Sequence, residues 1–148
     1  NLKNYTAEGR KVEKGLMEAQ RNLLYFASQQ QGVYQILKDV LEDDDFTEDA
    51  FRKGFHHIGE LWSSSGHVFP ADLVSRFEET KEQKMVTEIF AVQLPTENGA
   101  DMEKAINEEV RLLKRTKLDH LTATAATVED IQRMVEERKK LESLYITI

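Results

Sequence analysis

The sequence predicts an all-α protein, a helical bundle of about six helices followed by a C-terminal helical hairpin. Along most of the chain, apolar residues recur at intervals of three and four, the spacing that places them on one face of a helix. No segment shows the strict alternation of apolar and polar residues that is typical of a half-buried strand. The 148 residues include only two prolines and seven glycines, so few positions interrupt helices.

Composition excludes several classes of protein. An apolar fraction of 40% with 32% charged residues is typical of a globular domain, and no apolar run approaches the roughly 20 residues that a membrane span needs. The absence of cysteine excludes disulfides and thiolate zinc sites. The chain starts at Asn1, without an initiator methionine or the apolar segment of a signal peptide. We therefore expect a fragment of a longer cytoplasmic protein, without a membrane partner.

The net charge of −7 is unevenly distributed. Residues 41–97 contain 13 aspartates and glutamates against 5 lysines and arginines, whereas the last third of the chain is nearly balanced. Nucleic-acid-binding domains usually carry a basic face that neutralises phosphates. No such face is visible in this sequence, so we expect no direct binding to nucleic acid.

The N-terminal part predicts two helices after a polar start. Residues 1–14 are polar and mixed in charge, as in a linker or a frayed helix start. A helical pattern begins at Leu16 and ends in Gln29–Gly32, where we expect Gly32 to adopt the left-handed conformation that closes a helix. Apolar residues from Val33 to Leu41 then predict a short second helix.

Four consecutive carboxylates follow the second helix, at Glu42–Asp45. A calcium-binding loop alternates its ligands, turns at a glycine and ends in a glutamate, and this run does none of these. We interpret it as a solvated loop whose negative charges favour the positive end of the next helix. Thr47 is the predicted N-cap of that helix.

Three further helices are predicted in the middle of the chain. Phe51, Phe55, Ile58 and Trp62 line one face of the first, which ends at Ser63–Gly66. Aromatic residues at this spacing are typical of a core. Phe69-Pro70 begins a short helix with proline at its first position. The third helix has apolar positions that we expect to face inward, and Pro95 closes it; these positions are Met85, Val86, Ile89, Phe90 and Leu94.

The last third predicts two helices, within residues 101–121 and 128–145. Each carries an apolar stripe, and Thr127 with Asp130 forms a capping-box pattern at the start of the second. We divide the chain into a bundle over residues 1–110 and a hairpin over residues 111–148. Because isolated helices are marginal in water, the hairpin must pack on the bundle, on itself or on a partner.

The sequence contains no catalytic constellation. His56, His57 and Glu60 are close on one helix, but a zinc-protease helix needs H-E-x-x-H and a two-helix carboxylate site needs a second Glu and His set. Glycine-rich phosphate loops and a G-x-S-x-G nucleophile turn are also absent. We predict no enzymatic activity, no metal site and no cofactor for this fragment.

An interaction role is the remaining interpretation. The chain ends in Leu141, Leu144, Tyr145, Ile146 and Ile148, an unusually apolar set for a terminus. Packing of these residues back on the bundle is the alternative. We favour an exposed patch that docks on another protein, because a hairpin projecting past a bundle has little of its own domain to bury it on.

Several motifs resemble two related bacterial domains. Ala19-Gln20-Arg21-Asn22-Leu23-Leu24 is similar to an A-E-R-x-L-L motif, with Gln20 in place of the acidic residue. Asp45-Phe46 then precedes a helix with Phe51, His56 or His57, Ile58 and Leu61, and Gly66 precedes Phe69-Pro70-Ala71-Asp72-Leu73-Val74. This layout resembles both the N-terminal domain of the replicative DNA helicase and the C-terminal helicase-interacting domain of bacterial DNA primase. The hairpin within residues 101–145 resembles the primase domain.

The resemblance implies a non-catalytic module that docks primase onto the hexameric replicative DNA helicase. It would couple RNA primer synthesis to unwinding within the bacterial primosome, in the cytoplasm, and would modulate helicase activity. The fragment would be a monomer in isolation. The alternative is a helicase collar domain that self-associates. We predict partner contacts from the hairpin, with rim charges setting orientation; the residues are Ile131, Met134, Val135, Arg138, Leu141, Glu142, Leu144 and Tyr145.

Overall fold

The computed structural model describes the backbone of residues 2–148 and the side chains of residues 13–148. Over this range the chain is all-α and contains no β-strand, which confirms the predicted fold class. It has seven α-helices and one short 3-10 helix within residues 2–148: α1 Leu2–Gln29, α2 Gln31–Val40, η1 Asp43–Asp45, α3 Asp49–Ser65, α4 Pro70–Val74, α5 Thr80–Ile89, α6 Gly99–Thr124 and α7 Val128–Ser143.

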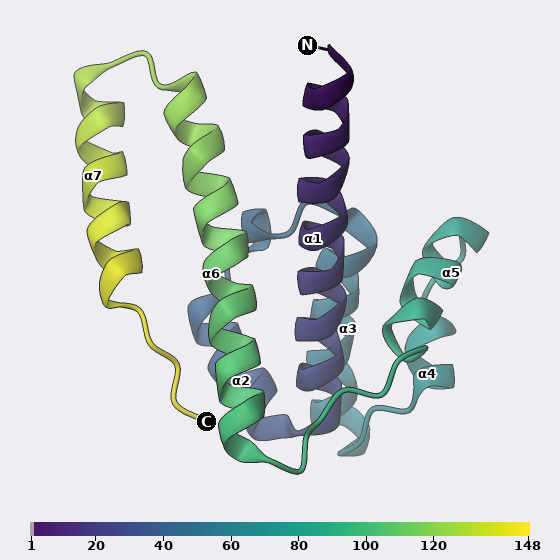
Figure 1. Cartoon of the computed structure of the whole chain (residues 1–148). Coiled ribbons are helices and arrows are strands. Elements are labelled where there is room, and N and C mark those ends of the chain that lie inside the picture. The colour runs from purple at the N-terminus through teal and green to yellow at the C-terminus, as the bar shows by residue number, and fades with distance from the viewer. Residues whose placement is uncertain (1) are drawn as a thin grey trace.

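Helix α1 is the central element of the bundle. It packs against α2, α3, α5 and α6, while α4 packs on α3 and α5 (Figure 1). Helix α7 lies on the outer side of α6, on the side of the molecule opposite to α4 and α5 (Figure 1). The hairpin is therefore attached to the bundle chiefly through α6.

The core consists of the apolar faces that the sequence predicts. Leu23 and Leu24 of α1, Phe51 and Ile58 of α3, and Ile106 of α6 are each at most 1% exposed. Burial of side chains of this size contributes roughly 1.5–3 kcal/mol each. Trp62 is half-buried, and its indole N–H donates to the carbonyl oxygen of Ala27 at 2.9 Å.

The first helix begins earlier than predicted, and it ends within the predicted stretch Gln29–Gly32 but without the expected glycine cap. α1 begins at Leu2, so the polar stretch expected to be a linker or a frayed start belongs to the helix; Asn1 lies outside the described residues. The break falls at Gln30, which is extended, and Gly32 lies inside α2. Gly66 is the glycine with a left-handed conformation, at φ 74°, and it closes α3 as the sequence predicts.

The buried amide of Gln20 explains why Thr47 is not the N-cap of α3. The Gln20 side chain accepts a hydrogen bond from the Thr47 backbone N–H at 3.0 Å and donates to the Thr47 hydroxyl at 2.9 Å. Glu48 occupies the N-cap position without a side-chain cap. Because these contacts need both a donor and an acceptor, an amide suits position 20 better than a carboxylate.

Helices α2 and α3 approach each other closely at Gly59. A Cβ atom at this position would lie 2.0 Å from the Tyr34 hydroxyl oxygen, so only a residue without a side chain fits. The tilted packing of the Tyr34 and Phe55 rings, with centroids 5.0 Å apart, continues the same interface. Gly59 therefore sets the distance between these two helices.

The C-terminal helices differ from the predicted boundaries at several points. Helix α5 ends at Ile89, before Pro95, because Phe90 already leaves the helical conformation. Helix α6 begins at Gly99, and the Asn98 side chain caps it by accepting the N–H groups of Ala100 and Asp101. It continues without a break through residue 110, where the sequence division into bundle and hairpin was placed.

Candidate interaction site on the C-terminal hairpin

The turn of the hairpin has the capping box that the sequence predicts. Helix α7 turns back along α6 after Ala125 (Figure 1). The Thr127 hydroxyl accepts the Asp130 backbone N–H at 3.1 Å, and the Asp130 carboxylate accepts the N–H groups of Ala126 and Thr127. Hydrogen bonds from the Ala126 backbone, then from Thr127, lower the pKa of Asp130. The start of α7 is therefore well defined.

Helix α7 presents an apolar row to solvent. Val128, Ile131 and Val135 are 65%, 53% and 48% exposed, and their spacing of three and four residues places them on one face. Within α7, whose residues are all described, no side chain is buried. A helix of this kind contributes little apolar burial to its own domain, so its outer face is available for a partner.

The predicted contact residues divide between two faces of the hairpin. Ile131, Val135, Glu142 and Tyr145 are exposed, whereas four others are half-buried: Met134, Arg138, Leu141 and Leu144. Val128 belongs to the outer row but was missing from the prediction, although its position three residues before Ile131 is a signal that sequence reasoning could have used.

Arg138 does not have the position of a free rim charge. Its guanidinium donates to the Asp119 carboxylate at 3.2 Å and to the Thr122 hydroxyl at 2.9 Å. Both acceptors belong to α6, so Arg138 joins the two helices of the hairpin. A role of Arg138 in orienting a partner stays a prediction, and a partner would have to compete with these two hydrogen bonds.

The segment after α7 packs back onto the bundle, contrary to the exposed apolar end that the sequence predicts. Ile146 is only 3% exposed. The Asn107 side chain of α6 accepts the Ile146 backbone N–H at 2.8 Å and donates to the Ile146 carbonyl oxygen at 2.8 Å. The Arg111 guanidinium donates to the carbonyl oxygens of Leu141 and Leu144. Tyr145 nevertheless remains 65% exposed.

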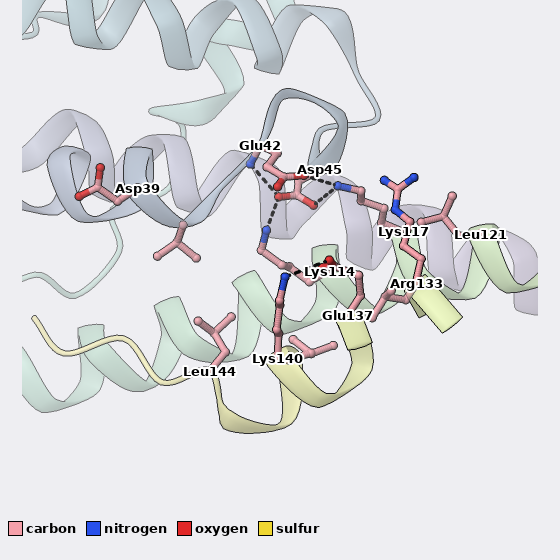
Figure 2. Close-up of a pocket in the computed structure, with 13 residues that line it drawn as sticks. Asp39, Glu42, Asp45, Lys114, Lys117, Leu121, Arg133, Glu137, Lys140 and Leu144 are labelled. Carbon is pink, nitrogen blue, oxygen red and sulfur yellow. Dashed lines mark hydrogen bonds and ion pairs between the residues drawn. The ribbon is translucent and has the colours of Figure 1, made fainter. Parts of the chain in front are cut away.

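A charged cleft of about 360 Å³ lies between α7, α6 and the α2–η1 region (Figure 2). Lys114 and Lys117 of α6 and Arg133 and Lys140 of α7 supply its positive charges. The cleft is also lined by carboxylates and by apolar side chains, namely Asp39, Val40, Glu42, Asp45, Leu118, Leu121, Glu137, Leu141 and Leu144. Positive and negative lining charges are equal in number, so the cleft does not select an anion or a cation by net charge.

The acidic run at residues 42–45 is only in part the solvated loop that we predicted, because Glu42, Asp43 and Asp44 are exposed whereas Asp45 is buried. Asp45 is 2% exposed and accepts the Lys114 ammonium at 2.7 Å. Lys117 donates to Glu42 and to Asp44, each at 2.7 Å. Because cations from α6 compensate these carboxylates, the run attaches η1 to α6, as Figure 2 shows for Asp45 and the two lysines.

These ion pairs shift the pKa values of their members. Hydrogen bonding to Lys117 is the main cause that lowers the pKa of Glu42 and of Asp44. Burial opposes the charged form of Lys117, but its hydrogen bonds with Asp44 and Glu42 outweigh burial and raise its pKa. All three groups are therefore charged at neutral pH.

The histidines that the sequence places together each lie beside a carboxylate. His56 lies 2.8 Å from the Asp43 carboxylate, and the Glu60 carboxylate is 3.5 Å from His57 and 2.6 Å from Arg76. Among the described residues, no group of three or more histidine, aspartate or glutamate side chains is arranged to hold a metal ion. Within the same part of the chain, no helix has the length and apolar character to cross a membrane.

Glu109 is the one strongly perturbed carboxyl group among the described side chains. It faces α1, where the Asn22 amide donates to its Oε1 at 2.9 Å, while its Oε2 is buried without a hydrogen-bond partner. Burial raises the pKa of Glu109 from 4.5 to about 8, with a smaller opposing effect of the Asn22 hydrogen bond. Glu109 does not line the cleft, although Lys114 and Lys117 of the same helix do.

Comparisons with protein-family models, curated proteins and solved structures found no match to this chain. The interpretation of the hairpin therefore depends on its own geometry and on the motif resemblance.

Proposed function

We propose that this chain is a non-catalytic docking module, equivalent to the C-terminal domain of bacterial DNA primase, that binds the hexameric replicative DNA helicase through its hairpin. Binding would hold primer synthesis near the unwound template in the bacterial replisome. The chain itself would need no cofactor and would not contact nucleic acid. The supporting observation is the exposed row of Val128, Ile131 and Val135 on a helix that buries none of its own side chains.

The arrangement of the row fits a partner that receives a helix in an apolar groove. Its three side chains lie within two turns of α7, which is the usual spacing of anchors in this mode of recognition. Exposed Glu142, in the last turn of α7, and exposed Tyr145, after its end, extend the surface. Charges around such a row influence the rate and specificity of association more than the final affinity.

A calorimetric titration of the intact chain with a hexameric replicative helicase tests the proposal at residue level. The Ile131→Ala, Val135→Ala double variant should bind at least about tenfold more weakly, because these side chains would form the apolar centre of the contact. Both residues are exposed, so the variant should retain the far-UV circular dichroism of the wild type.

Val92→Ala is the matched control for this titration. Val92 is 64% exposed and lies in the α5–α6 connection, away from the hairpin, so its truncation should leave affinity unchanged. Equal affinity of the double variant and the wild type would refute the proposed docking surface. Absence of binding by the wild type, together with self-association measured by light scattering, would favour the helicase-collar alternative.

A further inference from the structure

We infer that residues 144–148, which we call the strap, hold α7 against α6, and that α7 detaches from the bundle when the strap is released. The inference concerns the hairpin alone and does not depend on the proposed helicase partner. It assigns a conformational role to Asn107 of α6, a residue that neither the apolar pattern nor the motif resemblance singles out.

The contacts of the strap are more specific than those of α7 itself. Asn107 is 7% exposed and forms hydrogen bonds with both the N–H and the carbonyl oxygen of Ile146, each at 2.8 Å. Its amide therefore satisfies both backbone groups of this buried residue. Because Asn107 also donates to the Glu103 carbonyl oxygen, its side chain is fixed within α6. Arg111, one turn further along α6, binds the carbonyl oxygens of Leu141 and Leu144, at the point where α7 ends.

Apart from the strap, α7 packs on the bundle chiefly through α6, without burying any side chain of its own. Between residues 125 and 148, all of which the structure describes, Ile146 is the only buried side chain. The cleft separates α7 from η1 and α2, so these elements do not pack tightly against it (Figure 2). The remaining links along α7 include the exposed contacts of Arg138 with Asp119 and Thr122, which are weak in water.

These observations define a hinge and a latch. The hinge is the turn at Ala125–Thr127, and the latch is the pairing of Asn107 with Ile146. When the latch is closed, Leu141 and Leu144 line the cleft together with Leu118 and Leu121 of α6. Release of the strap would expose this inner apolar face to solvent. The outer row of α7 is exposed in either state, whereas exposure of the inner face requires release.

Hydrogen exchange of the free protein measures how tightly α7 is held. In Asn107→Ala, the amides of α7 should exchange about tenfold faster or more, because two hydrogen bonds to a buried segment are lost. The amides of α1 and α3 should keep their protection. Glu108→Ala is the matched control, since Glu108 is the exposed neighbour of Asn107 on α6 and should leave exchange in α7 unchanged.

A distance measurement detects detachment directly. The chain has no cysteine, so Lys81→Cys on α5 and Gln132→Cys on α7 provide two unique positions for nitroxide labels. Both side chains are exposed, and α5 and α7 lie on opposite sides of the molecule (Figure 1). The double electron–electron resonance distribution should be narrow in the otherwise unaltered chain and broad after Asn107→Ala.

A chain ending at Ser143 provides an independent variant that leaves α6 intact. It should show the same faster exchange in α7 and the same broad distance distribution as Asn107→Ala. Unchanged exchange and an unchanged distribution in this shortened chain, with normal far-UV circular dichroism, would overturn the inference. Failure of helicase binding in the titration above would not affect either measurement.

Discussion

Replacement of Glu109 by glutamine should make the protein more stable, and the gain should grow with pH. The wild-type carboxyl group is buried between α6 and α1, and its pKa is raised from 4.5 to about 8. Glutamine keeps an oxygen that can accept the hydrogen bond from Asn22 but cannot ionise. The substitution therefore removes a titration while preserving the size and the main contact of the side chain.

The expected magnitude follows from the difference between the folded and unfolded pKa values. The unfolded chain releases the Glu109 proton near pH 4.5, whereas the folded chain retains it up to about pH 8. The contribution of Glu109 to the stability of the wild type is thus fully present below pH 4.5 and is lost as the pH rises towards 8. At about 1.4 kcal/mol per pH unit, the loss by pH 7 is at most about 3.5 kcal/mol. Glutamine should recover most of this loss.

Urea denaturation followed by Trp62 fluorescence, at several pH values between 4.5 and 8.5, measures this effect. The difference in free energy of unfolding between Glu109→Gln and the wild type should increase steadily with pH. Glu42 and Asp44 titrate in both proteins and cancel in this difference. Glu136→Gln, an exposed change on α7, should give a difference that varies little with pH. A difference for Glu109→Gln that is constant over the range would refute the argument.

Three further substitutions test the packing of the bundle. Gly59→Ala should destabilise the protein by about 2 kcal/mol, because the new Cβ overlaps the Tyr34 ring. Gly15→Ala, whose Cβ meets no atom within 4 Å, should stabilise it by about 0.5–1 kcal/mol. Thermal unfolding measures both changes, and equal effects would contradict the close approach of α2 and α3 at Gly59. Lys114→Met should cost roughly 2–3 kcal/mol in urea denaturation, because it leaves the buried Asp45 carboxylate with only Lys117 nearby, and a neutral result would show that the pair contributes nothing.

Local patterns were sufficient to predict much of this fold. The apolar stripes of α3 and α6 became buried faces, because residues three and four apart meet on one side of a helix. The capping box at Thr127 and the end of α3 at Gly66 were also predicted correctly, since both depend on a few adjacent residues. The apolar residues of α7 follow the same spacing of three and four residues, but this spacing does not show whether an apolar face is buried or exposed.

The differences arise where the partner of a residue is distant in sequence. Asp45 was expected in solvent, and Glu42 and Asp44 without partners, because the lysines that pair with these three carboxylates are 69 to 75 residues further along the chain. The burial of Ile146 depends on Asn107, 39 residues earlier, whose amide has no signature in an apolar pattern. Thr47 does not cap α3 for the same reason, because its N–H and its hydroxyl pair with Gln20, 27 residues earlier.

The central claim is that the hairpin docks this chain on a replicative helicase, and titration of the intact chain with the purified hexamer in a calorimeter tests it most directly. We predict saturable binding that weakens when the outer row of α7 is truncated and persists when Val92 is truncated. The absence of any binding heat at several temperatures, with both proteins folded and the helicase hexameric, would contradict the account.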